Sequence, residues 1–175
     1  FKQLSHPGTC SVGYNSIRFD DEVTRNLFYR NFIDPDEREY LNGNSRWDLI
    51  DVVRLTFVLY PETLKWPLNE EGKVSFRLED IAKENSLLKG KSHDALGDVL
   101  TTIAVAKEIK TKQPRLFDFA FSHRSKNEIR NLLDLVNYKP IVHIASYYPK
   151  EECCMTLLSP LIEDSKNKNE IWCWD

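Results

Sequence analysis

Hydrophobic and polar positions along this 175-residue chain follow two periods, one typical of strands and one typical of helices. Short apolar runs bounded by turn residues predict strands, and longer runs with apolar residues three or four apart predict helices. In the first two thirds of the chain, the predicted strands are residues 11–15 and 46–50, and the predicted helices are residues 20–32, 51–59, 78–84 and 94–110. This order of elements predicts an α/β sandwich.

The longest predicted helix, residues 94–110, has apolar residues at Val99, Ile103, Ala106 and Ile109. Their spacing predicts that they form the buried stripe of the helix. Ser92 is a suitable N-cap, which would place the next residues in a first turn that favours negative charge.

The last third of the chain has a different pattern. Residues 141–145, 155–158 and 171–175 read as strands, and the third stops at the chain end, which predicts an unfinished sheet. Residues 34–45 are polar and loop-like, and Pro61 and Pro67 bracket a second loop around Trp66. Gln113-Pro114 marks the predicted boundary between a domain of residues 1–113 and a second part of residues 114–175.

Two segments carry the candidate chemistry. Asp20 follows the first predicted strand, and His93 lies 73 residues further on, with Asp98 five residues after it. Carboxylates hold Mg²⁺, and an imidazole with a pKa near neutrality can deprotonate a water, so the joint pattern predicts metal-assisted phosphodiester hydrolysis. Five residues span roughly 140° around an ideal helix, so His93 and Asp98 converge only if His93 precedes the regular helix.

Each of these residues also has a simpler interpretation. Asp20 alone would be an N-cap, Asp98 alone a solvated helix position, and His93 alone a surface residue. The formal charge of −3 is not evenly spread, because residues 107–130 carry seven Lys or Arg against three acids. That excess of four is either a solvated helix end or a phosphate-facing patch.

The four cysteines form no C-x-x-C pair, which predicts reduced thiols and a cytoplasmic protein. No apolar run approaches the roughly 18 residues of a membrane-spanning helix.

Four stretches resemble bacterial exonuclease I. They are GYNSIRFDDEVTRN at residues 13–26, NSRWDLIDV at 44–52, SFRLE at 75–79 and KQPRLFD at 112–118. The resemblance runs through nearly the whole chain and is clearest from residue 13 to about residue 124. That family belongs to the DEDD exonucleases with a histidine base, and its nuclease domain is followed by an SH3-like domain and a helical domain.

The resemblance implies roles for individual residues. Asp20 matches the carboxylate of the second exonuclease motif, and His93 and Asp98 match the base and the last carboxylate of the third. Asp20 and Asp98 would then bind Mg²⁺. Arg25, Arg54 and Arg77 would lie along the groove for the DNA strand, with Arg77 the strongest phosphate candidate. For Arg25 and Arg54, a salt bridge on a solvated helix face is an equal alternative.

The first motif of that family, an Asp-x-Glu pair on the opening strand of the sheet, has no counterpart in this sequence. Asp20-Asp21-Glu22 fits the letters, but it stands at a helix start and already accounts for the second motif. The chain also begins with Phe1. We therefore expect a chain truncated at both ends, with a partial ribonuclease H-like exonuclease domain followed by the start of an SH3-like β domain, and no activity by itself.

The resemblance implies hydrolysis of single-stranded DNA in the 3′ to 5′ direction, with release of 5′-mononucleotides, in DNA repair and recombination. The protein would be a monomer that also binds single-stranded DNA-binding protein. Three alternatives stay open. An RNA-trimming DEDD exonuclease would share the mechanism, although the SH3-like continuation argues against it. A non-catalytic fragment would only bind single-stranded DNA or fill a structural role. An HD-type phosphohydrolase, read from His93-Asp94, would need more metal-binding histidines than a chain with four supplies.

Overall fold

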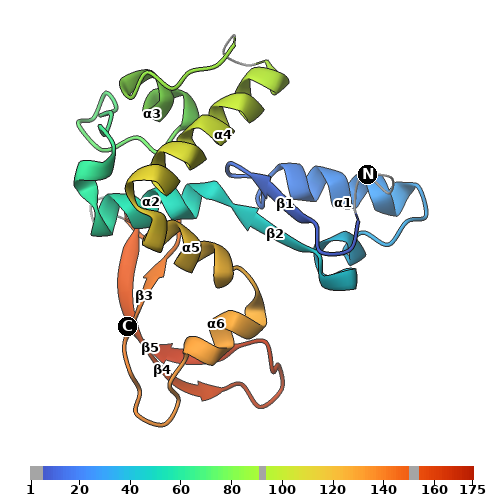
Figure 1. The fold of residues 1–175 in the computed structure, drawn as a ribbon. Helices are drawn as coiled ribbons and strands as arrows, with labels where there is room; N and C mark the ends of the chain where they lie inside the picture. Colours follow the sequence, from blue (N-terminus) through green and yellow to red (C-terminus); the bar gives the residue numbers. More distant parts are fainter. Residues whose placement is uncertain (1–5, 91–93, 150–153) are drawn as a thin grey trace.

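The first part of the chain is a small parallel sheet with helices packed beside it (Figure 1). The computed structural model describes residues 6–90, 94–149 and 154–175. Strand β1 (Cys10–Gly13) pairs in parallel with β2 (Ser45–Asp48), and helix α1 (Asp20–Arg30) lies in the connection between them. The predicted α/β class is confirmed, and the two strands and this helix occur where the pattern predicts them, with ends shifted by one or two residues.

The segment predicted as a polar loop before β2 contains two short 3-10 helices, η1 (Glu37–Glu39) and η2 (Leu41–Gly43). None of their residues is buried. The segment therefore packs through its polar side chains, and those contacts become important at the candidate site.

The apolar core lies among the helices that follow the sheet. They are α2 (Leu49–Leu59), η3 (Pro61–Thr63), α3 (Leu78–Glu84), α4 (Ala95–Lys112) and α5 (Pro114–Ser122). Leu49, Val53, Ile81, Val105 and Ile109 are fully buried in this core. Burying a branched apolar side chain stabilises a fold by roughly 1.5–3 kcal/mol, so this cluster is the main support of the first part.

The predicted buried stripe of α4 is wrong at two of its four positions. Val99 and Ile103 are 55% and 43% exposed, whereas Thr101, Val105 and Ile109 are buried. The helix turns the second set toward α2 and α3, which pack against it. Thr101 is tolerated there because its hydroxyl accepts a hydrogen bond from the backbone N–H of Lys89 at 3.1 Å.

Helix α5 is not predicted by the sequence pattern, although Pro114 at its first position is a favourable start. Phe117 and Phe121 of α5 both meet the ring of Trp47 edge to face, with ring centroids 5.1 Å apart in each case. The helix thus packs on β2, while the domain boundary at residues 113 and 114 stays a prediction.

The second part is an antiparallel sheet in the order β3-β4-β5, formed by β3 (Ile141–Ile144), β4 (Met155–Glu163) and β5 (Ile171–Trp174). All three strands are predicted, and β4 extends five residues beyond its predicted end. The unpredicted helix α6 (Lys126–Leu132) joins this part through Arg130, whose guanidinium lies 2.6 Å from Glu163.

In β3, the half-buried His143 has its Nδ1 3.1 Å from the hydroxyl of Tyr148. Burial lowers the pKa of His143, and the charges of Asp51 and Asp175 oppose that shift in part. In the described ranges no helix is both long and apolar enough to cross a lipid bilayer.

Candidate active site

Asp20 is placed by the tight turn that joins β1 to α1. Asn15 in this turn has a φ of 57°, a left-handed conformation that Asn adopts more readily than most residues. The buried carboxylate of Asp48 accepts the backbone N–H of Asn15 at 2.7 Å and that of Ile17 at 3.2 Å. The same carboxylate caps α2 by accepting the N–H of Ile50 at 3.1 Å. One side chain thus fixes both the turn before Asp20 and the start of the next helix.

Asp48 is not among the residues predicted above to belong to the site. An Asp directly before an apolar run is a helix-start signal, so its capping role could have been inferred from the sequence. Its two bonds to the distant turn could not, because they depend on the pairing of β1 with β2.

The structure brings Asp20 and Asp98 to one cleft of about 780 Å³. Asp20 is the first residue of α1, and Asp98 lies in the first turn of α4, where the helix dipole favours a carboxylate. The exposed Val99 and Ile103 line the same cleft, together with Val12 of β1. Two carboxylates from distant segments therefore share an open, partly apolar cleft.

His93, the predicted base, and Ser92, the predicted N-cap, lie outside the described residues. The N-cap position of α4 is Asp94, whose side chain makes no capping hydrogen bond. The α1 N-cap position is likewise Phe19, so Asp20 is the first helical residue and not a cap.

The carboxylates that line the cleft are the type of ligand that a hard cation binds, but among the described residues there are fewer of them than a complete metal site needs. Carboxylate oxygens such as those of Asp20 and Asp98 are ligands that Mg²⁺ takes. Over the part of the chain that the structure describes, no group of three or more His, Cys, Asp or Glu side chains is arranged to hold a metal ion. The two aspartates thus fit part of a magnesium site.

The three predicted DNA-binding arginines have different surroundings. Arg25 forms ion pairs with Glu22, with Asp36 at 3.0 Å and with Glu39 at 2.9 Å. Arg54 pairs with Asp51 at 2.8 Å. Arg77 is exposed at the N-cap position of α3. Arg25 and Arg54 thus form salt bridges in this structure, although their side chains are only 22% and 11% exposed and do not lie on a solvated face, while phosphate binding by all three stays a prediction.

Tyr14 links the first strand to the segment that carries Arg77. Its hydroxyl donates a hydrogen bond to the backbone oxygen of Phe76 at 2.7 Å. Burial raises the pKa of Tyr14 well above its ordinary value, so the hydroxyl stays protonated and able to donate even in alkaline solution.

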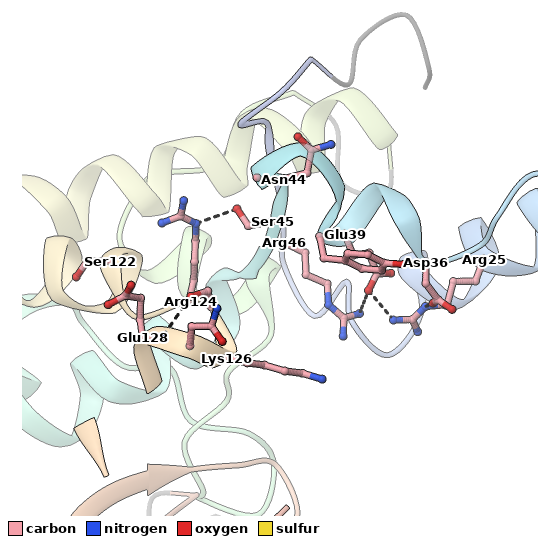
Figure 2. A pocket seen from close by; sticks show the side chains of 14 residues that line it. Arg25, Asp36, Glu39, Asn44, Ser45, Arg46, Ser122, Arg124, Lys126 and Glu128 are labelled. Atoms are coloured by element: carbon pink, nitrogen blue, oxygen red, sulfur yellow. Dashed lines mark hydrogen bonds and ion pairs between the residues drawn. The ribbon is translucent and has the colours of Figure 1, made fainter. Parts of the chain in front are cut away.

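A second cavity, of about 1050 Å³, lies between the 36–46 segment and the start of α6 (Figure 2). Arg124 reaches across it, donating from Nε to the Ser45 hydroxyl at 3.0 Å and stacking 4.0 Å above the Phe121 ring. Lys126 lines the same cavity, so part of the basic segment faces a cavity that also contains the acidic side chains of Glu39 and Glu128.

Comparison with known proteins shows the family of the chain. Residues 1–106 match the family model described as "Exonuclease", and residues 124–175 match the model described as "Exonuclease I SH3-like domain". The chain belongs to the exonuclease family.

Named relatives and solved structures show which members of the exonuclease family this chain is similar to. Exodeoxyribonuclease I of Escherichia coli is 47% identical over 165 residues, which are 94% of this chain and 35% of the relative. The structure of exonuclease I from Methylocaldum szegediense superposes with a TM-score of 0.92 at 46% identity, over 99% of this chain and 37% of that one. E. coli exonuclease I in complex with a dA16 oligonucleotide superposes with a TM-score of 0.89 at 45% identity, over 97% and 36%.

The chain spans about a third of the length of these relatives. The predicted resemblance to exonuclease I, and the predicted order of an exonuclease part followed by an SH3-like part, are confirmed.

Proposed function

We propose that this chain is part of an exodeoxyribonuclease that removes 5′-mononucleotides from the 3′ end of single-stranded DNA. The observation that carries the proposal is the convergence of Asp20 and Asp98, from two distant helix starts, on one cleft of an exonuclease-family fold. The similarity to exodeoxyribonuclease I supports DNA over RNA as the substrate. DNA repair and recombination are the processes that such an activity serves.

Asp20 and Asp98 supply two of the four carboxylates that the resemblance implies. When bound, Mg²⁺ would stabilise the negative charge that develops at the scissile phosphate. His93 would take the proton of the attacking water, a task that suits an imidazole near neutral pH. Both carboxylates are exposed and stand at helix N-termini, where a cation can reach them from solvent.

Arg77 is the phosphate ligand that we favour, because its guanidinium is exposed and α3 holds its backbone. Arg25 and Arg54 would join it once DNA phosphates compete with their present carboxylate partners. We further propose a cytoplasmic monomer with single-stranded DNA-binding protein as its protein partner, and a domain boundary near residues 113 and 114.

The test replaces the matching segment of the E. coli relative with this chain. The product, called the exchanged protein, is assayed for release of mononucleotides from a 3′-labelled single strand. The exchanged protein should be active with Mg²⁺, and the 175-residue chain alone should be inactive. Asp20→Asn and Asp98→Asn should each lower the rate roughly a hundredfold or more and raise the Mg²⁺ requirement, because an amide is a poorer ligand for a hard ion. Asp118→Asn, exposed on α5, is the matched control.

The outcomes separate the alternatives. An exchanged protein that prefers RNA would favour the RNA-trimming exonuclease. One that binds single-stranded DNA without hydrolysing it would favour the non-catalytic fragment, an alternative supported by the incomplete ligand set of the described residues. Full activity in both aspartate variants would refute the proposed site.

A further inference from the structure

The first turn of α1, which carries Asp20, has no side-chain cap. The N-cap residue is Phe19, and it makes no side-chain hydrogen bond to the helix. The backbone N–H of Asp21 bonds instead to the carbonyl of Ser16 at 2.9 Å, and that of Val23 to the carbonyl of Phe19 at 3.0 Å. Helix ends without a capping side chain fray more readily, so this turn depends on some other support.

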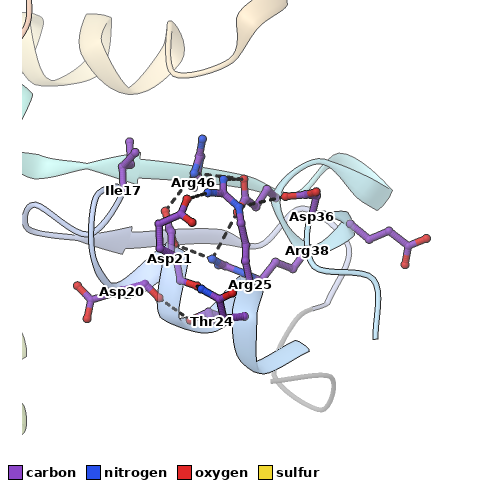
Figure 3. Close-up of polar contacts among 12 residues, drawn as sticks. Ile17, Asp20, Asp21, Thr24, Arg25, Asp36, Arg38 and Arg46 are labelled. Carbon is purple, nitrogen blue, oxygen red and sulfur yellow. Dashed lines mark hydrogen bonds and ion pairs between the residues drawn. The ribbon is translucent and has the colours of Figure 1, made fainter. Parts of the chain in front are cut away.

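The side chain of Asp21 provides that support through two arginines (Figure 3). Arg38, on η1, lies 2.6 Å from one carboxylate oxygen of Asp21, and Arg46, on β2, lies 3.3 Å from the other. The side chains of Arg38 and Asp21 are only 7% and 9% exposed. Charge-assisted hydrogen bonds shielded from water in this way are stronger than those on the surface.

Glu39 extends the same network to the rest of the segment. Its carboxylate lies 3.5 Å from Arg38, 3.2 Å from Arg46 and 2.9 Å from Arg25. Arg38 and Arg46 thus bridge two nearly buried carboxylates, Asp21 on α1 and Glu39 on η1, and Arg25 of α1 pairs with Glu39 alone of these two. The 36–46 segment is therefore fastened to the start of α1 by charge, without any buried apolar residue of its own 3-10 helices.

Asp20 is displayed on the other side of this anchored turn. Figure 3 shows its carboxylate directed away from the ion network, while its backbone oxygen accepts the Thr24 hydroxyl at 2.7 Å. Asp20, Asp21, Arg38 and Asp98 all line the same cleft. Because Asp20 and Asp21 are adjacent in the first turn of α1, we expect a looser Asp21 to shift Asp20 relative to Asp98.

We propose that Arg38 is a positioning residue for the metal-binding carboxylate of Asp20, acting through its ion pair with Asp21. This inference rests on the proposed function for the role of Asp20. Arg38 itself touches neither the metal nor the DNA in this proposal.

The first test uses the 175-residue chain and amide hydrogen exchange. Arg38→Gln should speed exchange at the amides of Asp21 and Val23 by about tenfold or more, because it removes a charged hydrogen bond from a nearly buried partner. The amide of Gln113, bonded to the Ile109 carbonyl at the far end of α4, should not change. Arg30→Gln, exposed in the last turn of α1, is the matched control.

A double-mutant cycle checks that the pair is responsible. Asp21→Asn keeps the shape of the side chain but removes its charge, and its effect should not add to that of Arg38→Gln. Arg38→Lys should give an intermediate rate of amide exchange, because the Lys ammonium keeps the positive charge but lacks the planar set of N–H donors of the guanidinium. Fully additive effects, or equal loss of protection at Gln113, would show a general structural role and overturn the proposal.

The second test measures kinetics in the E. coli relative that carries this chain. Arg38→Gln should lower kcat roughly ten- to a hundredfold and raise the Mg²⁺ concentration for half-maximal rate, with the KM for DNA within about twofold. A raised KM with unchanged Mg²⁺ dependence would make Arg38 a DNA contact and refute its positioning role. If the E. coli relative that carries this chain with Arg38 intact hydrolyses no DNA, the proposed function fails. The amide hydrogen exchange of the first test then decides by itself whether Arg38 holds the turn.

Discussion

Replacing Asp48 with Ala should destabilise the fold more than its size suggests. The buried carboxylate accepts three backbone N–H groups, from Asn15 and Ile17 in the turn before α1 and from Ile50 in the first turn of α2. Alanine removes both acceptor oxygens and with them all three hydrogen bonds. The turn that precedes Asp20 and the start of α2 then lose their common anchor.

The size of the effect follows from the surroundings of the three donors. Loss of an N-cap costs about 1 kcal/mol. Asn15 and Ile17 are exposed residues, so water can replace part of their lost bonds, and each bond contributes about 1 kcal/mol. The expected loss is about 3 kcal/mol, which lowers the Tm of a domain of this size by roughly 6–12 °C.

Urea unfolding followed by circular dichroism measures this loss as a lower midpoint with an unchanged slope. Asp48→Asn should lose less than Asp48→Ala, because its amide oxygen still accepts hydrogen bonds. The matched control is Asp118→Ala on α5, whose 69% exposed carboxylate is 4.0 Å from Lys110 and should contribute less than about 0.5 kcal/mol. Equal midpoints for Asp48→Ala and Asp118→Ala would refute the anchoring role.

Four further predictions concern activity, pH and thiols. In the E. coli relative carrying this chain, His93→Ala should lower kcat roughly 10²–10⁴-fold with little change in DNA affinity, and near-normal turnover at neutral pH would exclude His93 as the base. Arg77→Ala should weaken binding of the single strand and reduce its salt dependence, whereas an unchanged salt slope would rule out a phosphate contact. Because burial lowers the pKa of His143, the unfolded chain binds more protons in the pH range below the ordinary histidine value of about 6.5, so stability should fall as the pH drops through that range. His143→Gln should flatten that fall, and an unchanged slope would assign it to other groups. All four cysteines should titrate as free thiols in native, oxidant-free protein, and a mass shift for a disulfide would contradict this.

Local patterns in the sequence were sufficient for the five strands, for helices α1 to α4 and for the family, but not for helices α5 and α6. Helix α3 begins and ends at the predicted residues, and all five strands occur where short apolar runs predict them. Asp20 and Asp98 could be singled out because their residue types and the motifs around them are local properties of the sequence. The structure places both at helix starts that line one cleft with β1, and their catalytic role stays a prediction.

The tertiary structure alone decided which partners each side chain meets. Periodicity shows that α4 has apolar positions but not which of them face α2 and α3, so Thr101 is buried while Val99 and Ile103 line the cleft. The two bonds from Asp48 to the turn and the pairing of Arg38 with Asp21 join segments separated by 17 or more positions, and no local pattern encodes them. Helix and strand propensities act over a few neighbouring residues, whereas these contacts depend on the tertiary fold that brings distant segments together.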